Sequence, residues 1–160
     1  MGEALRQAAA ALAAGEFPVG CVLVRGEGIV AAGARRGSRA PGGGELGHAE
    51  MVALQALSGK EEASAPLRAF VTLEPCLMCF AALLLHGVGE IVFAFEDVMG
   101  GATTLDRSRL APLYRNRPLR VQGGVRRAES LRLLQAFYRD PGNAYWQGSL
   151  LAAHILAQPE

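Results

Sequence analysis

Residues 67–79, LRAFVTLEPCLMC, carry the signals for a strand and a helix in one short stretch. The apolar run at 67–73 predicts a buried strand. Pro75 is typical of the first turn of a helix, so we expect a helix over about residues 76–86. Cys76 and Cys79 are three residues apart in that turn, so both thiols face the same way. The helix dipole and the unpaired N–H groups there favour thiolates.

A second helix is predicted from HAEMVALQAL, because apolar residues recur there at helical spacing over about residues 47–58. His48 lies in the first turn of this helix, and Glu50 follows two residues later. Both helices follow strands, and their N-termini are expected to meet at one crevice at the edge of a sheet.

His48, Cys76 and Cys79 together form the ligand set of a catalytic zinc ion (Zn²⁺), which needs three protein ligands and one open position. Glu50 is not needed as a ligand. Its carboxylate can take a proton from an attacking water and pass it to a leaving nitrogen. Two other readings of the cysteines remain open: a redox pair and an incomplete structural zinc site.

The remaining elements alternate between strands and helices, which predicts a layered α/β fold. The expected strands are 17–25, 29–34, 90–95 and 119–124, and the expected helices are 3–14, about 106–114, about 127–139 and about 146–157.

Length and composition indicate a single domain over residues 1–160, with 51% apolar residues and 19% charged residues. Its core is expected to span about 3–139, and 140–160 would form a C-terminal helical extension. Three cysteines favour a reducing compartment, and no apolar run approaches the ~18 residues of a membrane span. The N-terminus has no basic leader, so we expect a cytoplasmic protein.

Residues 105–140 hold nine arginines against three acidic residues. This stretch is either a solvated basic face or a surface that contacts RNA phosphates. The overall net charge of +1 implies no nucleic-acid partner by itself.

The order HAE then PCLMC matches the H-x-E…P-C-x-x-C signature of zinc-dependent nucleobase deaminases. The match extends over about residues 3–139. The chain resembles the bacterial branch that contains tRNA adenosine, guanine and cytosine deaminases. The stretches that carry this resemblance are GEFPVGCVLV (15–24), HAEMVAL (48–54), VTLEPCLMC (71–79), IVFAFED (91–97) and LLQAFYR (133–139).

This resemblance implies a single deaminase domain with a three-layer α/β/α cytidine-deaminase-like fold and a five-stranded mixed sheet. It also implies zinc on the His and two Cys residues, Glu50 as proton shuttle, and a homodimer. The base would contact Ala49 and the backbone around the second motif, at Glu74 and Pro75.

Two departures from the branch bear on the substrate. Arg35 stands where these relatives commonly carry an Asn that grips the base, and we expect it to bind substrate. Met99 and Gly100 replace a Lys-Thr-Gly-like loop that touches RNA. Arg35 and Arg36 would either hold a substrate anion or be solvated loop charges.

These departures favour a small aminated base or nucleoside as substrate. A tRNA adenosine-to-inosine deaminase is the alternative, and a catalytically idle partner subunit with a zinc fold is an alternative of another class. Tyr145 and Trp146 would pack in the core, or else cover the pocket or a dimer contact; core packing is favoured.

Overall fold

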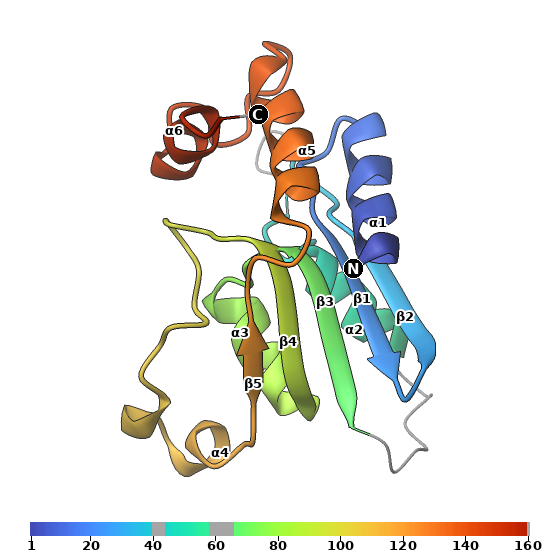
Figure 1. Ribbon diagram of the computed structural model, residues 1–160, viewed down its shortest axis with the longest axis vertical. Coiled ribbons are helices and arrows are strands. Elements are labelled where there is room, and N and C mark those ends of the chain that lie inside the picture. Colours follow the sequence, from blue (N-terminus) through green and yellow to red (C-terminus); the bar gives the residue numbers. More distant parts are fainter. Residues whose placement is uncertain (40–43, 58–65, 160) are drawn as a thin grey trace.

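The computed structural model describes residues 1–39, 44–57 and 66–159. In this part of the chain five strands form one mixed sheet in the order β2-β1-β3-β4-β5 (Figure 1). β1 pairs antiparallel with β2 and β3, whereas β3–β4 and β4–β5 are parallel pairs. The strands are β1 (Gly20–Arg25), β2 (Gly28–Ala34), β3 (Leu67–Leu73), β4 (Val88–Phe95) and β5 (Arg120–Gln122).

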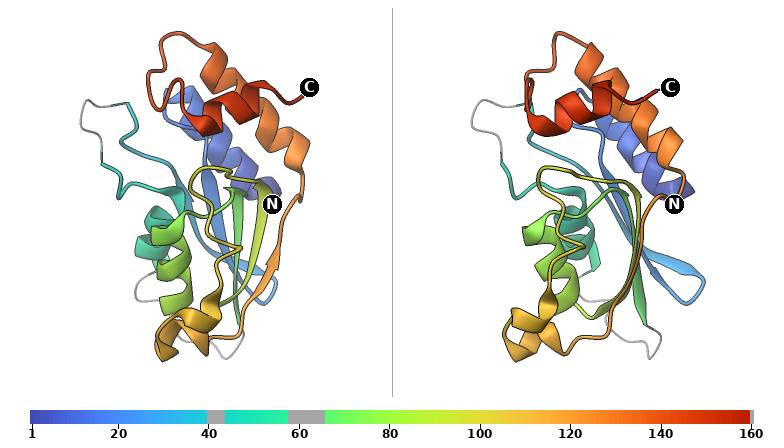
Figure 2. Two further views of the ribbon diagram at one scale, coloured as in Figure 1. Left: turned by 90° about the vertical axis from the view of Figure 1, so that its left-hand side faces the viewer. Right: turned by 60° about the vertical axis from the view of Figure 1, so that its left-hand side comes forward.

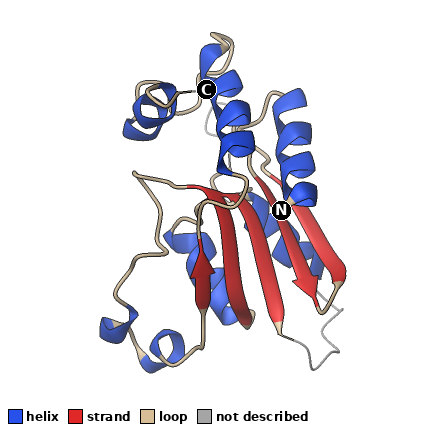
Figure 3. Cartoon of the chain, viewed as in Figure 1, coloured by secondary structure: helices blue, strands red, loops and turns tan. Residues whose placement is uncertain are grey.

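Helices cover both faces of the sheet, which confirms the predicted three-layer α/β/α fold (Figures 2 and 3). α1 and α5 lie on one face and α2 and α3 on the other. α6 packs beside α5 beyond the end of the sheet. The helices are α1 (Gly2–Ala13), α2 (Ala49–Leu57), α3 (Leu77–Leu85), α4 (Pro112–Arg115), α5 (Arg127–Arg139) and α6 (Leu150–Leu156), with a 3-10 turn at Arg107–Arg109. None of the helices in the described residues is both long and apolar enough to cross a membrane.

Two glycines allow helices to approach the sheet on opposite faces. A Cβ on Gly20 of β1 would lie 2.1 Å from the Ala4 carbonyl oxygen of α1. A Cβ on Gly33 of β2 would lie 2.3 Å from the Ala49 carbonyl oxygen at the start of α2. No real Cβ tolerates such distances to backbone, so these glycines set how closely α1 and α2 pack.

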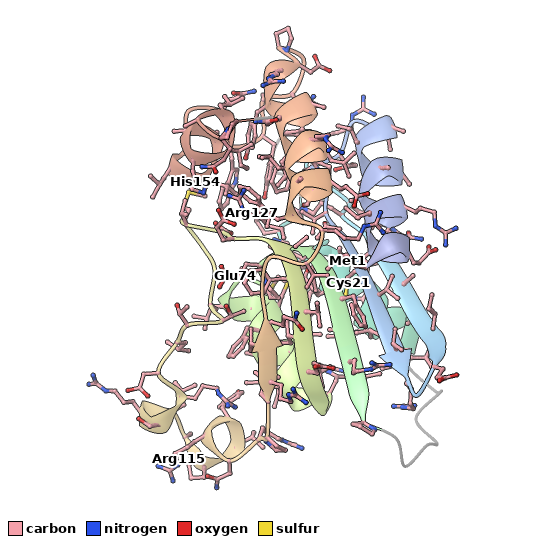
Figure 4. All side chains as sticks on the ribbon, viewed as in Figure 1. Met1, Cys21, Glu74, Arg115, Arg127 and His154 are labelled. Atoms are coloured by element: carbon pink, nitrogen blue, oxygen red, sulfur yellow. The ribbon has the colours of Figure 1, made fainter. Side chains whose placement is uncertain are left out.

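The end of the sheet is tied to α5 and α6 by one carboxylate. Glu96 follows β4, accepts hydrogen bonds from Arg127 of α5, and lies 2.9 Å from Nε2 of His154 on α6. Figure 4 shows Arg127 and His154 beside one another above this end of the sheet. Hydrogen bonding to Arg127 lowers the pKa of Glu96 to about 2.

Two predicted boundaries near the N-terminal strand and the arginine-rich stretch are wrong. The strand expected over 17–25 begins at Gly20, because Pro18 has no N–H to donate to a ladder. The helix expected over 106–114 is two short pieces, Arg107–Arg109 and Pro112–Arg115. Pro112 opens the second piece, since it cannot continue a helix begun before it.

The last helix was expected from residue 146 and begins only at Leu150. Trp146 and Gly148 both have left-handed backbone, with φ of 55° and 72°, so the chain cannot be helical there. Ser149 caps the helix instead, because its hydroxyl accepts a hydrogen bond from the Ala152 N–H.

Candidate active site

Three side chains that could hold a metal ion meet between the N-termini of α2 and α3. His48 immediately precedes α2, Cys76 caps α3, and Cys79 lies in the first turn of α3. The His48 Nδ1 atom lies 3.5 Å from Cys76 Sγ and 3.4 Å from Cys79 Sγ. All three ligand atoms lie within 4.8 Å of one another.

This spacing fits zinc. In a tetrahedral site with bonds of ~2.3 Å to sulfur and ~2.0–2.1 Å to nitrogen, sulfur and nitrogen ligands are about 3.6 Å apart. Two thiolates and one imidazole are also ligands that zinc prefers. The three side chains would therefore supply three of the four ligands of a tetrahedral zinc site.

The two cysteines share a proton unevenly. The hydrogen bond from Cys79 lowers the pKa of the Cys76 thiol to about 4. The same hydrogen bond and burial raise the pKa of Cys79. One thiolate is thus present at neutral pH, which is the form that binds a cation.

Glu50 lies in the first turn of α2 and is almost fully buried, with 3% of its surface exposed. Burial raises the pKa of its carboxyl, although the nearby His48 opposes that effect. A buried carboxyl with a raised pKa beside three candidate metal ligands is suited to hold and release a proton.

A cavity of about 70 Å³ opens beside these residues. It brings together residues from the two motifs, from the loop after β4, and from the segment that leads to α6. Its lining comprises Phe17, Val19, Arg35, His48, Ala49, Glu50, Leu73, Glu74, Cys76, Asp97, Gly100, Tyr145, Trp146 and Leu151. Of the residues expected to contact substrate, Arg35, Ala49 and Glu74 line the cavity. Pro75 is not among the lining residues, and its carbonyl accepts a hydrogen bond from the Ala102 N–H.

Arg35 is not a solvated loop charge, since only 3% of its surface is exposed. Its guanidinium donates to the Gly44 carbonyl at 3.2 Å and to the Tyr145 hydroxyl at 3.2 Å, and it lies 3.4 Å from Glu45. Arg36, by contrast, is exposed. The two arginines therefore differ in exposure, and of the two only Arg35 lines the cavity.

Glu45 was not singled out from the sequence, yet one of its oxygens connects three residues of the site. Oε2 lies 3.5 Å from His48 Nε2, 3.4 Å from Arg35, and 3.1 Å from the Tyr145 hydroxyl. A carboxylate at the second nitrogen of a ligating histidine orients the ring. The sequence carried no signal for this contact, because Glu45 and His48 both lie before α2, where helical spacing does not apply.

Glu74 supports the loop that follows β4. Its carboxylate accepts hydrogen bonds from the Thr103 N–H and hydroxyl and from the Asp97 N–H. Figure 4 shows Glu74 near the end of the sheet, far from Arg115. These bonds hold the loop wall of the cavity; contact of Glu74 with substrate stays a prediction.

Tyr145 and Trp146 both line the cavity. Core packing is confirmed for Tyr145, whose ring lies 5.5 Å from that of Phe17 in the core. It is wrong for Trp146, which is 43% exposed. Cys21 is fully buried in the core, and His86 ends α3, with Nδ1 2.9 Å from the Ala82 carbonyl oxygen.

Known proteins are similar to this chain in both sequence and fold. Residues 1–95 match the model of the cytidine and deoxycytidylate deaminase zinc-binding region. A tRNA-specific adenosine deaminase of Streptococcus pyogenes serotype M18 is 32% identical over 142 residues, which cover 87% of each chain. The tRNA(Ile)-lysidine synthase of Thermus thermophilus is 42% identical over 139 residues, 86% of this chain. This chain spans only 24% of the length of that synthase.

Solved structures of deaminases are similar to this chain in fold. A tRNA:A34 deaminase that performs A-to-I editing at the wobble position superposes with a TM-score of 0.67 and 28% identity, over 82% of this chain and 95% of that one. The guanine deaminase of Nitrosomonas europaea has the same fold, with a TM-score of 0.67 at 22% identity, over 85% of this chain and 81% of that one. The chain thus belongs to the cytidine and deoxycytidylate deaminase family, whose zinc-binding region its residues 1–95 match.

Proposed function

We propose that the protein hydrolyses the exocyclic amino group of a nucleobase, with zinc held by His48, Cys76 and Cys79 and with Glu50 as proton shuttle. The observation that carries this proposal is Glu50: a buried carboxyl with a raised pKa, on the cavity wall that also contains two of the three ligands. When bound, zinc lowers the pKa of a water molecule from 15.7 to about 7 and so supplies a nucleophile at neutral pH.

Glu50 would perform two proton transfers. Its carboxylate takes the proton of the attacking water, and the resulting carboxylic acid gives that proton to the nitrogen that leaves as ammonia. Burial supports both steps, because it keeps the pKa of the acid high enough to hold the proton between them. Ala49 and the cavity walls would hold the base in the plane where its amino-bearing carbon meets the nucleophile.

The geometry favours a small aminated base or nucleoside. Arg35, Tyr145 and Trp146 form one wall of the cavity, and a wall there restricts the path of a nucleotide that is still joined to its chain. The second candidate is a tRNA adenosine, which is favoured by the relatives that are named as tRNA enzymes. Two arginines of the arginine-rich stretch give little support to the tRNA candidate, because both already pair with carboxylates of this chain. Arg126 pairs with Glu129, and Arg127 pairs with Glu96.

Ammonia release tests the proposal. Zinc-loaded protein is incubated with free bases, nucleosides and a tRNA anticodon stem–loop. We expect Glu50→Gln to keep the fold and the metal but to lose about 10²–10⁴-fold in rate. Glu90→Gln on β4, away from the cavity, is the matched control and should react at the wild-type rate. Wild-type turnover by the Glu50→Gln variant would contradict the shuttle. No ammonia from any substrate would favour an idle partner subunit.

We also propose a homodimer, in line with the family resemblance. The outer face of α3 supports it, since Leu77 and Leu85 are 60% and 46% exposed. Such leucines on one helix are typical of a protein contact. Light scattering on the purified protein would show one or two chains per particle.

A further inference from the structure

Two aromatic rings stand side by side on the cavity wall. Tyr145 and Trp146 have ring centroids 5.5 Å apart and planes inclined by 26°, so the rings are stacked. Both line the cavity that holds His48 and Glu50. They lie between α5 and α6, outside the two metal-binding motifs, and neither has a part in the proposed chemistry.

Tyr145 is held by contacts with several neighbouring side chains. Its hydroxyl accepts a hydrogen bond from Arg35 and lies 3.1 Å from Glu45 Oε2, to which it donates. Its ring packs against Phe17, and the Arg35 guanidinium carbon lies 5.4 Å from the ring centroid. A ring with so many fixed neighbours is a rigid surface for Trp146 to stack on.

Trp146 combines two unfavourable features. Its backbone is left-handed, with φ of 55°, which is rare for a bulky side chain. The residue is nonetheless 43% exposed, although a large aromatic side chain gains most from burial. Strain of this kind persists at ligand-binding sites, where the surrounding structure imposes it. A hydrogen bond from the Ser149 N–H to the Trp146 carbonyl helps to maintain this turn.

We propose that Tyr145 and Trp146 form a stacking wall that receives the planar ring of the aminated base. The inference rests on the proposed function and adds to it a specificity-determining residue, Trp146. Every nucleobase has a π-face, so such a wall selects flat aromatic substrates without reading their edges. Arg35 and Glu45 are the positioning residues of this wall, because their contacts with the Tyr145 hydroxyl hold Tyr145 in place. The same stacking serves a free base, a nucleoside, or a base turned out of an RNA loop.

Trp146 is the single tryptophan of the chain, so its fluorescence reports on the wall directly. The Glu50→Gln protein, loaded with zinc, is titrated with guanine, adenosine, cytidine and an anticodon stem–loop, with excitation beyond the absorbance of the bases. Equilibrium dialysis measures binding of each probe independently. We expect the probe that binds to quench Trp146 emission with the same dissociation constant. Quenching by the small molecules identifies a small substrate; quenching by the stem–loop alone identifies RNA.

Variants then test the ring itself. In the Glu50→Gln background, Trp146→Leu should weaken binding by about tenfold to a hundredfold, whereas Trp146→Phe should retain most of it. Leu150→Ala is the control, since Leu150 is exposed nearby on α6 and does not line the cavity. Circular dichroism confirms that each variant is folded. If the Trp146→Leu variant unfolds, quenching of Trp146 emission in the Glu50→Gln protein still tests the stacking wall.

A probe that binds without quenching, or equal binding by a folded Trp146→Leu variant, overturns the stacking wall. If the wild-type protein releases ammonia in such a case, the proposed function holds and only the stacking wall is wrong. If no probe binds and no ammonia is released, the proposed function fails and the stacking wall fails with it.

Discussion

Substituting Gly33 with alanine should damage the proposed metal site without any change to a proposed ligand. The new Cβ would lie 2.3 Å from the Ala49 carbonyl oxygen and 2.6 Å from the Ala53 nitrogen, both of them backbone atoms of α2. Ordinary contact begins near 3.4 Å, so the start of α2 must move by about 1 Å. Ala49 lies between His48 and Glu50, and both move with it.

The expected cost has two parts. Overpacking typically lowers the free energy of unfolding by about 1–3 kcal/mol. A misplacement of about 1 Å at reacting groups can lower the rate by about 10²-fold, and metal ligands tolerate only about 0.2 Å. Gly33→Ala should therefore bind zinc more weakly and react about 10²-fold more slowly per folded molecule.

Gly20→Ala is the matched control. It forces a similar clash with the Ala4 carbonyl oxygen and the Ala8 nitrogen, but on α1, which carries no ligand. Urea denaturation measures stability, chelator competition measures zinc affinity, and ammonia release measures rate on the best substrate of the panel. Both variants should lose stability, and only Gly33→Ala should lose zinc affinity and rate. Equal loss of zinc affinity in both, or none in Gly33→Ala, would refute the reasoning.

Three further outcomes are expected. Metal analysis of protein purified without chelator should find about one zinc per chain, and much less in Cys79→Ser; an active wild-type protein without zinc would exclude the site. Glu96→Gln should lower the free energy of unfolding at pH 7 by about 1–2 kcal/mol, after allowance for the exposure of the pair with Arg127. Because the folded pKa is about 2 against an ordinary 4.5, this loss should be complete above pH 4.5 and should disappear as the pH falls towards 2, and urea denaturation across this range checks it. Glu74→Gln should lower the free energy of unfolding by about 1–3 kcal/mol, since the Thr103 and Asp97 N–H groups donate to different carboxylate oxygens, one of which becomes an NH2 donor, and a wild-type denaturation midpoint would contradict this.

The predicted metal site could be read from the sequence because its signals are local. Pro75 marks the start of a helix, and the spacing of Cys76 and Cys79 places two thiols on one face of it. His48 and Glu50 share the start of another helix, so their relative position is also local. The pairing of the two helix starts was inferred from their common position after strands, and the structure brings them together.

Local signals were less reliable where single residues break a periodic pattern. The apolar run near the C-terminus predicted a helix from residue 146, but the left-handed turn at Trp146 delays it to Leu150. Tryptophan carries no signal for such a turn, because its side chain disfavours that backbone. The surrounding contacts impose it, and these exist only in the folded chain.

The sequence by itself determined the proposed chemistry: the candidate ligand set, the carboxyl beside it, and the alternation of strands and helices that forms the sheet. The tertiary structure alone decided what surrounds the substrate cavity. Arg35 and Tyr145 are 110 residues apart, and no local pattern indicates that they touch. Long-range packing brings them together, because α5 and the turn after it return the chain to the end of the sheet where β2 finishes. Arg35 is therefore a buried residue of the cavity wall, although its neighbours in the sequence indicate only a basic loop.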